Sequence, residues 1–147
     1  MSKKHKQKIQ AGQAVPTTGG IPKAQLPDDH ILFSLRYHDN TNCKFGLNEC
    51  EADYFREIIG RLISVCQMNE RQFRQPFGNS KSLRSHFLDF KKTSEQNGFG
   101  FSNLIWNGKQ WQFSISKTHG RIHGFLEGNV FHIVWFDPKH NLYPWND

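Results

Sequence analysis

The sequence has no long apolar run, no leader-like segment and few cysteines, and each absence narrows the classes of protein to consider. No stretch approaches the roughly 18 apolar residues that span a bilayer, and the lysine-rich start lacks the apolar core of a signal peptide. The three cysteines, Cys43, Cys50 and Cys66, show no CxxC spacing, which fits reduced thiols better than a disulfide framework or a zinc knuckle. We therefore expect a soluble protein of the cytoplasm, with Cys66 in its core.

The short signatures of common nucleotide, dinucleotide, zinc-protease and serine-hydrolase sites are also absent. The sequence contains no GxxxxGK[ST], GxGxxG, HExxH or GxSxG. Those classes become much less probable, and we expect a protein without a cofactor.

Positive charge is in excess, with 19 lysines and arginines against 13 aspartates and glutamates and a formal net charge of +6. Half of this excess lies in residues 1–29, a stretch dominated by polar residues, glycine and proline. Its few apolar residues cannot offset the entropy cost of ordering, so we expect a disordered basic arm. The residues of this arm that we expect to bind nucleic-acid phosphates are Lys3, Lys4, Lys6 and Lys8. A solubilising tail is the alternative.

Residues 30–147 are predicted to form a single domain, and its clearest element is a long helix. The helix is predicted from about Asn48 to Met68, with Asn48 as N-cap and Glu51 three residues later in a capping box. A short second helix is predicted around Asn69 to Gln75, before a proline. Helical spacing predicts that the long helix faces the core through Phe55, Ile58, Ile59, Leu62, Ile63 and Cys66.

Apolar segments with strand-like spacing flank these helices. In Trp111–Lys117 apolar and polar residues alternate, which predicts a strand with one buried face. Glu127-Gly128-Asn129 predicts a tight hairpin turn with the glycine at positive φ. The predicted strands are His30–Tyr37, Ser82–Phe90, Trp111–Lys117, Gly120–Leu126 and Val130–Phe136. An N-terminal strand, one long and one short helix and an antiparallel meander define an α+β fold.

Basic and aromatic side chains gather at one end of the predicted meander. Arg121 and His123 share a face of one strand, while His140 and Tyr143 follow the last strand. Such side chains can cleave RNA without a metal, because histidine transfers protons, arginine holds a phosphate, and tyrosine donates a proton or stacks on a base. We predict catalytic roles for these four residues, with Lys139 as a nucleic-acid contact.

Each of these residues also has a structural interpretation. Arg121 can pair with a carboxylate such as Glu127, and a strand histidine such as His123 is commonly hydrogen-bonded within the core. Tyr143 can pack its ring on the sheet and leave its hydroxyl in water. The sequence leaves both sets of interpretations open.

Two further clusters deserve a prediction. Arg84 and His86 are two residues apart in Ser82–Phe90, and we predict that they share a strand face and bind nucleic acid. The histidines near the C-terminus raise the question of a metal site: His119, His123, His132 and His140, with Asp137. On an ideal strand, however, His119 and His123 lie about 13 Å apart, too far for one ion, and we predict no metal site.

The element order, the arginine that opens a hairpin strand (Arg121) and the closing His140 and Tyr143 resemble the RelE and YoeB family of small bacterial toxins. The likeness covers about two thirds of the chain. It implies a RelE-like topology and a ribosome-associated endoribonuclease, in which Arg121 holds the phosphate while His140 and Tyr143 act as general acid or stacking residues. The stretch Gly120–Pro144 is also similar to small uncharacterised bacterial proteins, which suggests a family of its own.

Three hypotheses about function follow. The first is an RNA-directed, metal-independent endoribonuclease of a toxin–antitoxin or defence system, acting on RNA or the ribosome and held inactive by a protein partner. The second is a non-catalytic module that binds nucleic acid or protein through the arm, Lys139 and exposed aromatic residues. The third is an interaction protein that binds no nucleic acid. Turnover of RNA distinguishes the first from the other two.

Overall fold

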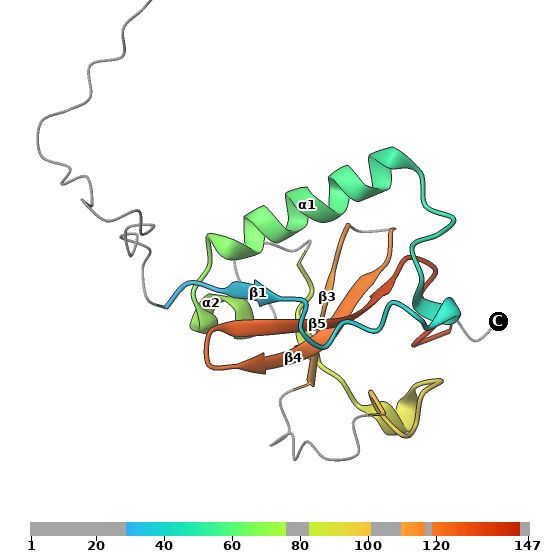
Figure 1. Cartoon of the computed structure of the whole chain (residues 1–147). Helices are drawn as coiled ribbons and strands as arrows, with labels where there is room; N and C mark the ends of the chain where they lie inside the picture. The colour runs from blue at the N-terminus through green and yellow to red at the C-terminus, as the bar shows by residue number, and fades with distance from the viewer. Residues whose placement is uncertain (1–28, 76–82, 101–109, 117–118, 145–147) are drawn as a thin grey trace, which may run out of the picture.

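The computed structural model describes residues 29–75, 83–100, 110–116 and 119–144 (Figure 1). The basic arm and its four lysines lie outside the described residues, so its predicted disorder and phosphate contacts stay predictions. The described part contains two α-helices, two short 3₁₀ helices and five strands. None of its helices is long and apolar enough to cross a membrane.

The five strands form one mixed sheet, which confirms the predicted α+β fold. They are β1 (Leu32–Ser34), β2 (His86–Phe87), β3 (Gln110–Ser114), β4 (Arg121–Glu127) and β5 (Val130–Asp137), in the spatial order β1-β5-β4-β3-β2. Strands β3, β4 and β5 are the predicted antiparallel meander. β2 extends the meander beside β3, and β1 pairs with β5 in parallel. The RelE-like topology stays a prediction.

Two of the strands are much shorter than the sequence indicated. Only Leu32–Ser34 of the predicted strand His30–Tyr37 pairs with β5. Only His86–Phe87 of the predicted strand Ser82–Phe90 pairs with β3. Both are edge strands, and each pairs with one neighbour only. A turn away from that single neighbour therefore ends the strand.

A tight turn and a bulge shape the hairpin of β4 and β5. Gly128 has a φ of 58°, which confirms the predicted glycine turn. Farther along the hairpin the register shifts between His123 and Gly124. A Cβ added at Gly124 would lie 2.0 Å from the carbonyl oxygen of His132, so only glycine fits where the two backbones come this close.

The long helix α1 (Ala52–Cys66) begins later than predicted. Its N-cap is Glu51, so the predicted cap at Asn48 is wrong. The short helix α2 (Glu70–Arg74) lies where predicted, and the capping box belongs to this helix instead. All three cysteines are free, and Cys66 is half-buried rather than in the core.

The predicted core face of α1 is only partly correct. Ile58 and Val65 are buried, but Phe55, Ile59 and Ile63 are 42%, 55% and 59% exposed. Apolar residues occupy two neighbouring rows along this helix, and helical spacing alone does not show which row meets the sheet. The row of Ile58 and Val65 docks, and the row of the other three residues faces outward.

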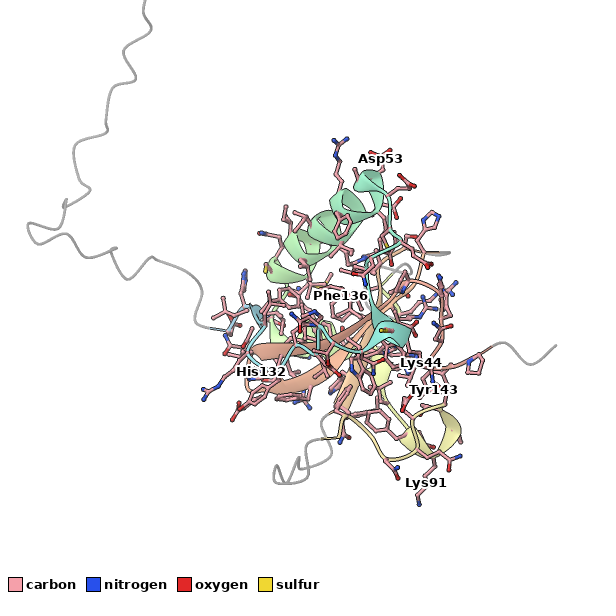
Figure 2. All side chains as sticks on the ribbon, turned by 45° about the vertical axis from the view of Figure 1, so that its right-hand side comes forward. Lys44, Asp53, Lys91, His132, Phe136 and Tyr143 are labelled. Carbon is pink, nitrogen blue, oxygen red and sulfur yellow. The ribbon has the colours of Figure 1, made fainter. Side chains whose placement is uncertain are left out.

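Both faces of the sheet are covered, so the prediction that β3 has only one buried face is wrong. The helix α1 covers one face, as Figure 1 shows. The 3₁₀ helices η1 (Cys43–Phe45) and η2 (Phe90–Lys92) contribute aromatic rings to the core on the other. Figure 2 shows α1 and η2 on opposite sides of the sheet. Gln112 and Ser114, on this second face, are therefore only 3% and 0% exposed.

Candidate functional site

The four residues predicted to be catalytic line one cavity of about 560 Å³, called here the Arg121 cavity. Arg121 and His123 come from β4, while His140 and Tyr143 belong to the segment after β5. The cavity is also lined by His86, Phe87, Asp89, Lys92, Gln112, Asp137 and Pro144. The predicted convergence of these side chains is therefore present, and their catalytic roles stay predictions.

Arg121 is a half-buried cation at this cavity. Among the described residues, no carboxylate oxygen lies within 4.0 Å of its guanidinium nitrogens. Glu127, the alternative partner considered from the sequence, binds His132 instead at 3.1 Å. Burial and the positive charge of Arg84 lower the pKa of Arg121, but an arginine remains charged at neutral pH. A charge without a paired carboxylate is suited to binding an anion.

His123 is among the residues around the cavity, but its side chain is fully buried. Its Nε2 donates to Oδ2 of Asp137 at 3.1 Å. Burial lowers the pKa of His123 in spite of this carboxylate, which makes the ring neutral. Burial alone would raise the pKa of Asp137, but hydrogen bonds from His123 and from backbone amides hold it below its usual value. The pair is thus a neutral imidazole on a carboxylate, and His123 presents no surface to a ligand, as its structural interpretation requires.

His140 has an uncommon backbone, and one of its ring nitrogens accepts a hydrogen bond. Its φ of 57° lies in the left-handed region, where few residues with a side chain are found. The backbone N–H of Gly120 donates to its Nε2 at 3.2 Å, so a neutral ring carries its proton on Nδ1. In this state the Nδ1–H of His140 is a hydrogen-bond donor.

Tyr143 contributes a further donor. Its hydroxyl oxygen accepts a hydrogen bond from the backbone N–H of Asp89 at 3.1 Å, which leaves the phenolic hydrogen available to donate. The ring packs against the core on the second face of the sheet. Lys92 also lines the cavity; its side chain is 78% exposed, and its ammonium lies 3.5 Å from the Asp89 carboxylate.

Arg84 and His86 do not share a strand face as predicted, because β2 begins only at His86. Arg84 is exposed, with a φ of 47°, and its charge is near enough to lower the pKa of Arg121. His86 lines the cavity, and its Nδ1 donates to the carbonyl oxygen of Phe87 at 3.0 Å. Its Nε2 is then the acceptor for the side-chain amide of Gln112.

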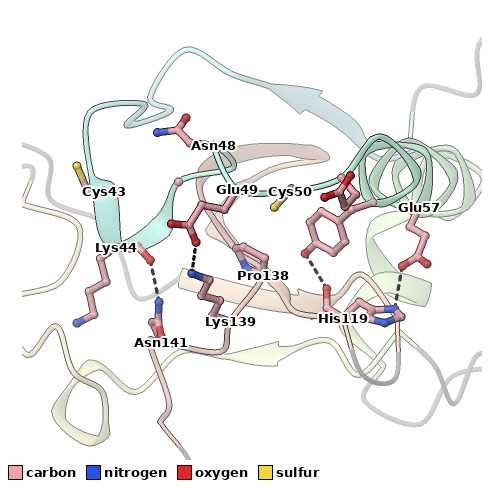
Figure 3. Close-up of a pocket in the computed structure, with 13 residues that line it drawn as sticks. Cys43, Lys44, Asn48, Glu49, Cys50, Glu57, His119, Pro138, Lys139 and Asn141 are labelled. Carbon is pink, nitrogen blue, oxygen red and sulfur yellow. Dashed lines mark hydrogen bonds and ion pairs between the residues drawn. The ribbon is translucent and has the colours of Figure 1, made fainter.

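Lys139 lies in a different cavity, of about 580 Å³, between the segment before α1 and the segment after β5 (Figure 3). Its ammonium forms an ion pair with Glu49, and both side chains are exposed. The same cavity contains His119, whose Nδ1 lies 3.0 Å from Oε2 of Glu57. Lys139 does not line the Arg121 cavity, and its contact with nucleic acid stays a prediction.

The histidines considered as metal ligands have other partners. His119 binds Glu57, His132 binds Glu127, and His123 binds Asp137. In the part of the chain that the structure describes, no three histidine, cysteine, aspartate or glutamate side chains are grouped closely enough to hold a metal ion.

Two residues of the cavity were missed as site residues in the sequence. Gln112 was expected on a solvent-facing side of β3, and Asp137 was considered only as a metal ligand. The hairpin turn contains only a partial signal for Asp137: counting back from Gly128 along both strands places Phe136 opposite Arg121, and the register shift between His123 and Gly124 brings Asp137 there instead. No comparable signal exists for Gln112, because the elements that cover it are irregular.

Acidification is expected to destabilise the protein through His123. A histidine whose pKa is lowered in the fold takes up a proton only on unfolding, so stability is lost as the pH falls below the unfolded value of about 6.5. The free energy of unfolding, measured with urea, should fall between pH 7 and 5 by at most about 1.4 kcal/mol per pH unit for this one group.

The matched variant is His123→Gln, whose amide can still donate to Asp137 but does not titrate. We expect a shallower dependence of stability on pH in this variant. An identical slope in both proteins would show that His123 is not the responsible group.

Comparisons of the chain with protein-family models, with curated proteins and with solved structures found no match. Its function has to be inferred from its own residues.

Proposed function

We propose that the chain binds RNA by seating a backbone phosphate in the Arg121 cavity, and that it cleaves this RNA as a metal-independent, toxin-like endoribonuclease. One observation carries the proposal. Hydrogen-bond donors from separate parts of the chain, Arg121 on β4 and His140 and Tyr143 after β5, line the same cavity.

The phosphate-binding part of the proposal follows from the chemistry of these donors. Phosphate oxygens accept hydrogen bonds, and an arginine fork binds two of them at once. The Nδ1–H of His140 and the hydroxyl of Tyr143 are further donors. The cavity volume of about 560 Å³ lies in the range of small-ligand sites. The formal net charge of +6 favours association with RNA at low salt.

The cleavage part requires two proton transfers. The 2′-oxygen of the RNA loses its proton and attacks phosphorus, the bond from phosphorus to the 5′-oxygen breaks, and that oxygen takes up a proton. Arg121 would stabilise the charge that develops on the phosphate oxygens. Tyr143 or His140 would supply the proton to the leaving oxygen, and His140 would act as the base once its Nε2 is released by Gly120.

A second candidate function is binding of RNA without cleavage. It is favoured by the hydrogen bonds of His140 and His86, the two histidines of the cavity that have exposed surface. The Nε2 atom of His140 accepts from Gly120, and that of His86 accepts from Gln112. In this arrangement both rings are set to donate rather than to remove a proton from a 2′-hydroxyl. Cleavage therefore requires one of these bonds to open, whereas binding does not.

The toxin-like part of the proposal rests on the resemblance to RelE and YoeB. It implies that the protein acts in the cytoplasm on RNA or on the ribosome. It also implies a protein partner that keeps the enzyme inactive by covering the Arg121 cavity. An acidic partner segment would match the positive charge of Arg121.

The test is to map RNA cuts by primer extension after adding purified protein to a translating extract. A parallel reaction on naked RNA in EDTA tests whether cleavage needs a metal ion. We expect cuts with the wild type and none with His140→Ala. Intact RNA together with tight RNA binding would favour the non-catalytic module. Failure to bind RNA at physiological salt would favour an interaction protein that does not act on nucleic acid.

A further inference from the structure

We propose that Asp137 is a positioning residue whose carboxylate holds the segment 138–143 in the shape that presents His140 and Tyr143 to the Arg121 cavity. The consequence for RNA rests on the proposed function. The positioning itself can be tested without RNA.

Asp137 is 1% exposed at the end of β5, and three donors converge on its carboxylate. Oδ1 accepts from the backbone N–H of Asn141 at 2.7 Å. Oδ2 accepts from the backbone N–H of Leu142 at 2.9 Å and from Nε2 of His123 at 3.1 Å. A single side chain thus ties the start of the segment to its end and ties both to β4.

The segment that Asp137 closes contains an unfavourable backbone. His140 is in the left-handed region, where glycine or asparagine is the usual choice in a turn that only has to reverse the chain. Residues with strained backbones persist only where their surroundings determine them, and they cluster at functional sites. The surroundings here are Asp137 on one side and Gly120, which donates to the His140 ring, on the other.

The end of the segment is fixed as well. Leu142 is fully buried in the core on the second face of the sheet, directly before Tyr143. The hydrogen bond from the Leu142 amide to Asp137 therefore fixes the backbone from which the side chain of Tyr143 extends. By binding the amides of Asn141 and Leu142, the carboxylate fixes the backbone next to His140 and Tyr143. It therefore positions both proposed phosphate donors.

The first test is amide hydrogen exchange, measured by NMR, in Asp137→Asn. Asn141 and Leu142 donate to different oxygens of the carboxylate, and asparagine replaces one of these oxygens with an NH2 group, so at least one of the two bonds is lost. We expect the Gly120 amide, whose partner is the His140 ring, to exchange at least about tenfold faster, the factor that corresponds to the loss of one hydrogen bond. The Ile31 amide, bonded to Met68 at the far end of the sheet, reports any global change.

The matched control is Glu127→Gln. Glu127 forms the other histidine–carboxylate pair of the hairpin, with His132, and this substitution removes its carboxylate. Its Gly120 exchange should equal that of the wild type. The proposal would be overturned if, in Asp137→Asn, the exchange rate of the Gly120 amide changed no more than that of the Ile31 amide.

The second test separates positioning from general stability by a double-mutant cycle. Binding of an uncleavable 2′-O-methyl RNA is measured for Asp137→Asn, His140→Ala and the double variant. If Asp137 acts through His140, His140→Ala should weaken binding several-fold in the wild type and less than about twofold after Asp137→Asn. Additive effects would show that Asp137 does not act through His140. A wild type that binds no RNA would refute the proposed function, while the exchange experiment would still decide the role of Asp137.

Discussion

Replacing Arg121 with alanine is expected to weaken RNA binding by roughly 10- to 100-fold, which corresponds to the loss of hydrogen bonds to a charged partner. Cleavage should fall further, by roughly 100- to 1,000-fold, because a donor to the developing charge is lost as well. The fold should survive. No carboxylate among the described residues lies within 4.0 Å of the guanidinium, so its removal breaks no close ion pair there.

The matched control for Arg121→Ala is Arg56→Ala. Arg56 is an exposed arginine on α1 whose contact with Asp53 is 3.9 Å long. Both variants remove one positive charge, so both reduce long-range attraction to RNA equally. Fluorescence anisotropy at several salt concentrations measures the binding, and thermal unfolding checks the fold. Equal loss of affinity in the two variants would mean that Arg121 acts only through net charge and that its cavity holds no phosphate.

Replacing Gly124 with alanine is expected to destabilise the protein by about 3 kcal/mol or more, at the upper end of the cost of overpacking. The new Cβ would lie 2.0 Å from the His132 carbonyl oxygen and 2.7 Å from the Phe131 ring. The carbonyl belongs to the backbone of β5, so the hairpin has to move to make room. Urea unfolding gives the free energy difference.

The same substitution at Gly60 is the control, and its effect should have the opposite sign. Gly60 is exposed in the middle of α1, and a Cβ there meets no atom within 4 Å among the described residues. Alanine should therefore stabilise the helix by about 0.5 to 1 kcal/mol, the usual difference from glycine. If Gly124→Ala were as stable as the wild type, the close approach at the bulge would not exist in solution.

The elements that the sequence predicted well are those set by local patterns. Alternation in β3 and the glycine at the turn between β4 and β5 specify a meander without knowledge of the rest of the chain. The docking row of α1 was predicted only in part, because Phe55 and Ile58 both belong to apolar rows and the choice depends on contact with the sheet. The edge strands were overextended for a similar reason, since their length depends on neighbours.

The convergence of Arg121, His140 and Tyr143 could be predicted because hairpin geometry brings the start of β4 beside the end of β5. The sequence could not decide between a catalytic and a buried, structural His123. The burial of this side chain depends on the irregular segments around η1 and η2, which cover the second face of the sheet and have no periodic pattern. The sequence could not show which cavity Lys139 lines, because the conformation of a short segment after a strand depends on side-chain contacts such as those of Asp137.

The parallel pairing of β1 with β5 has a consequence for when the Arg121 cavity forms. The side chain of Asn129 donates to the carbonyl oxygen of His30, 99 positions earlier in the chain. Contacts between such distant segments form late, because the chain between them has to be closed first. We expect β1 to remain unpaired until β5 has left the ribosome, and the Arg121 cavity to be completed only with the segment that follows β5. The cleavage proposed above would then begin only after these last segments have been synthesised.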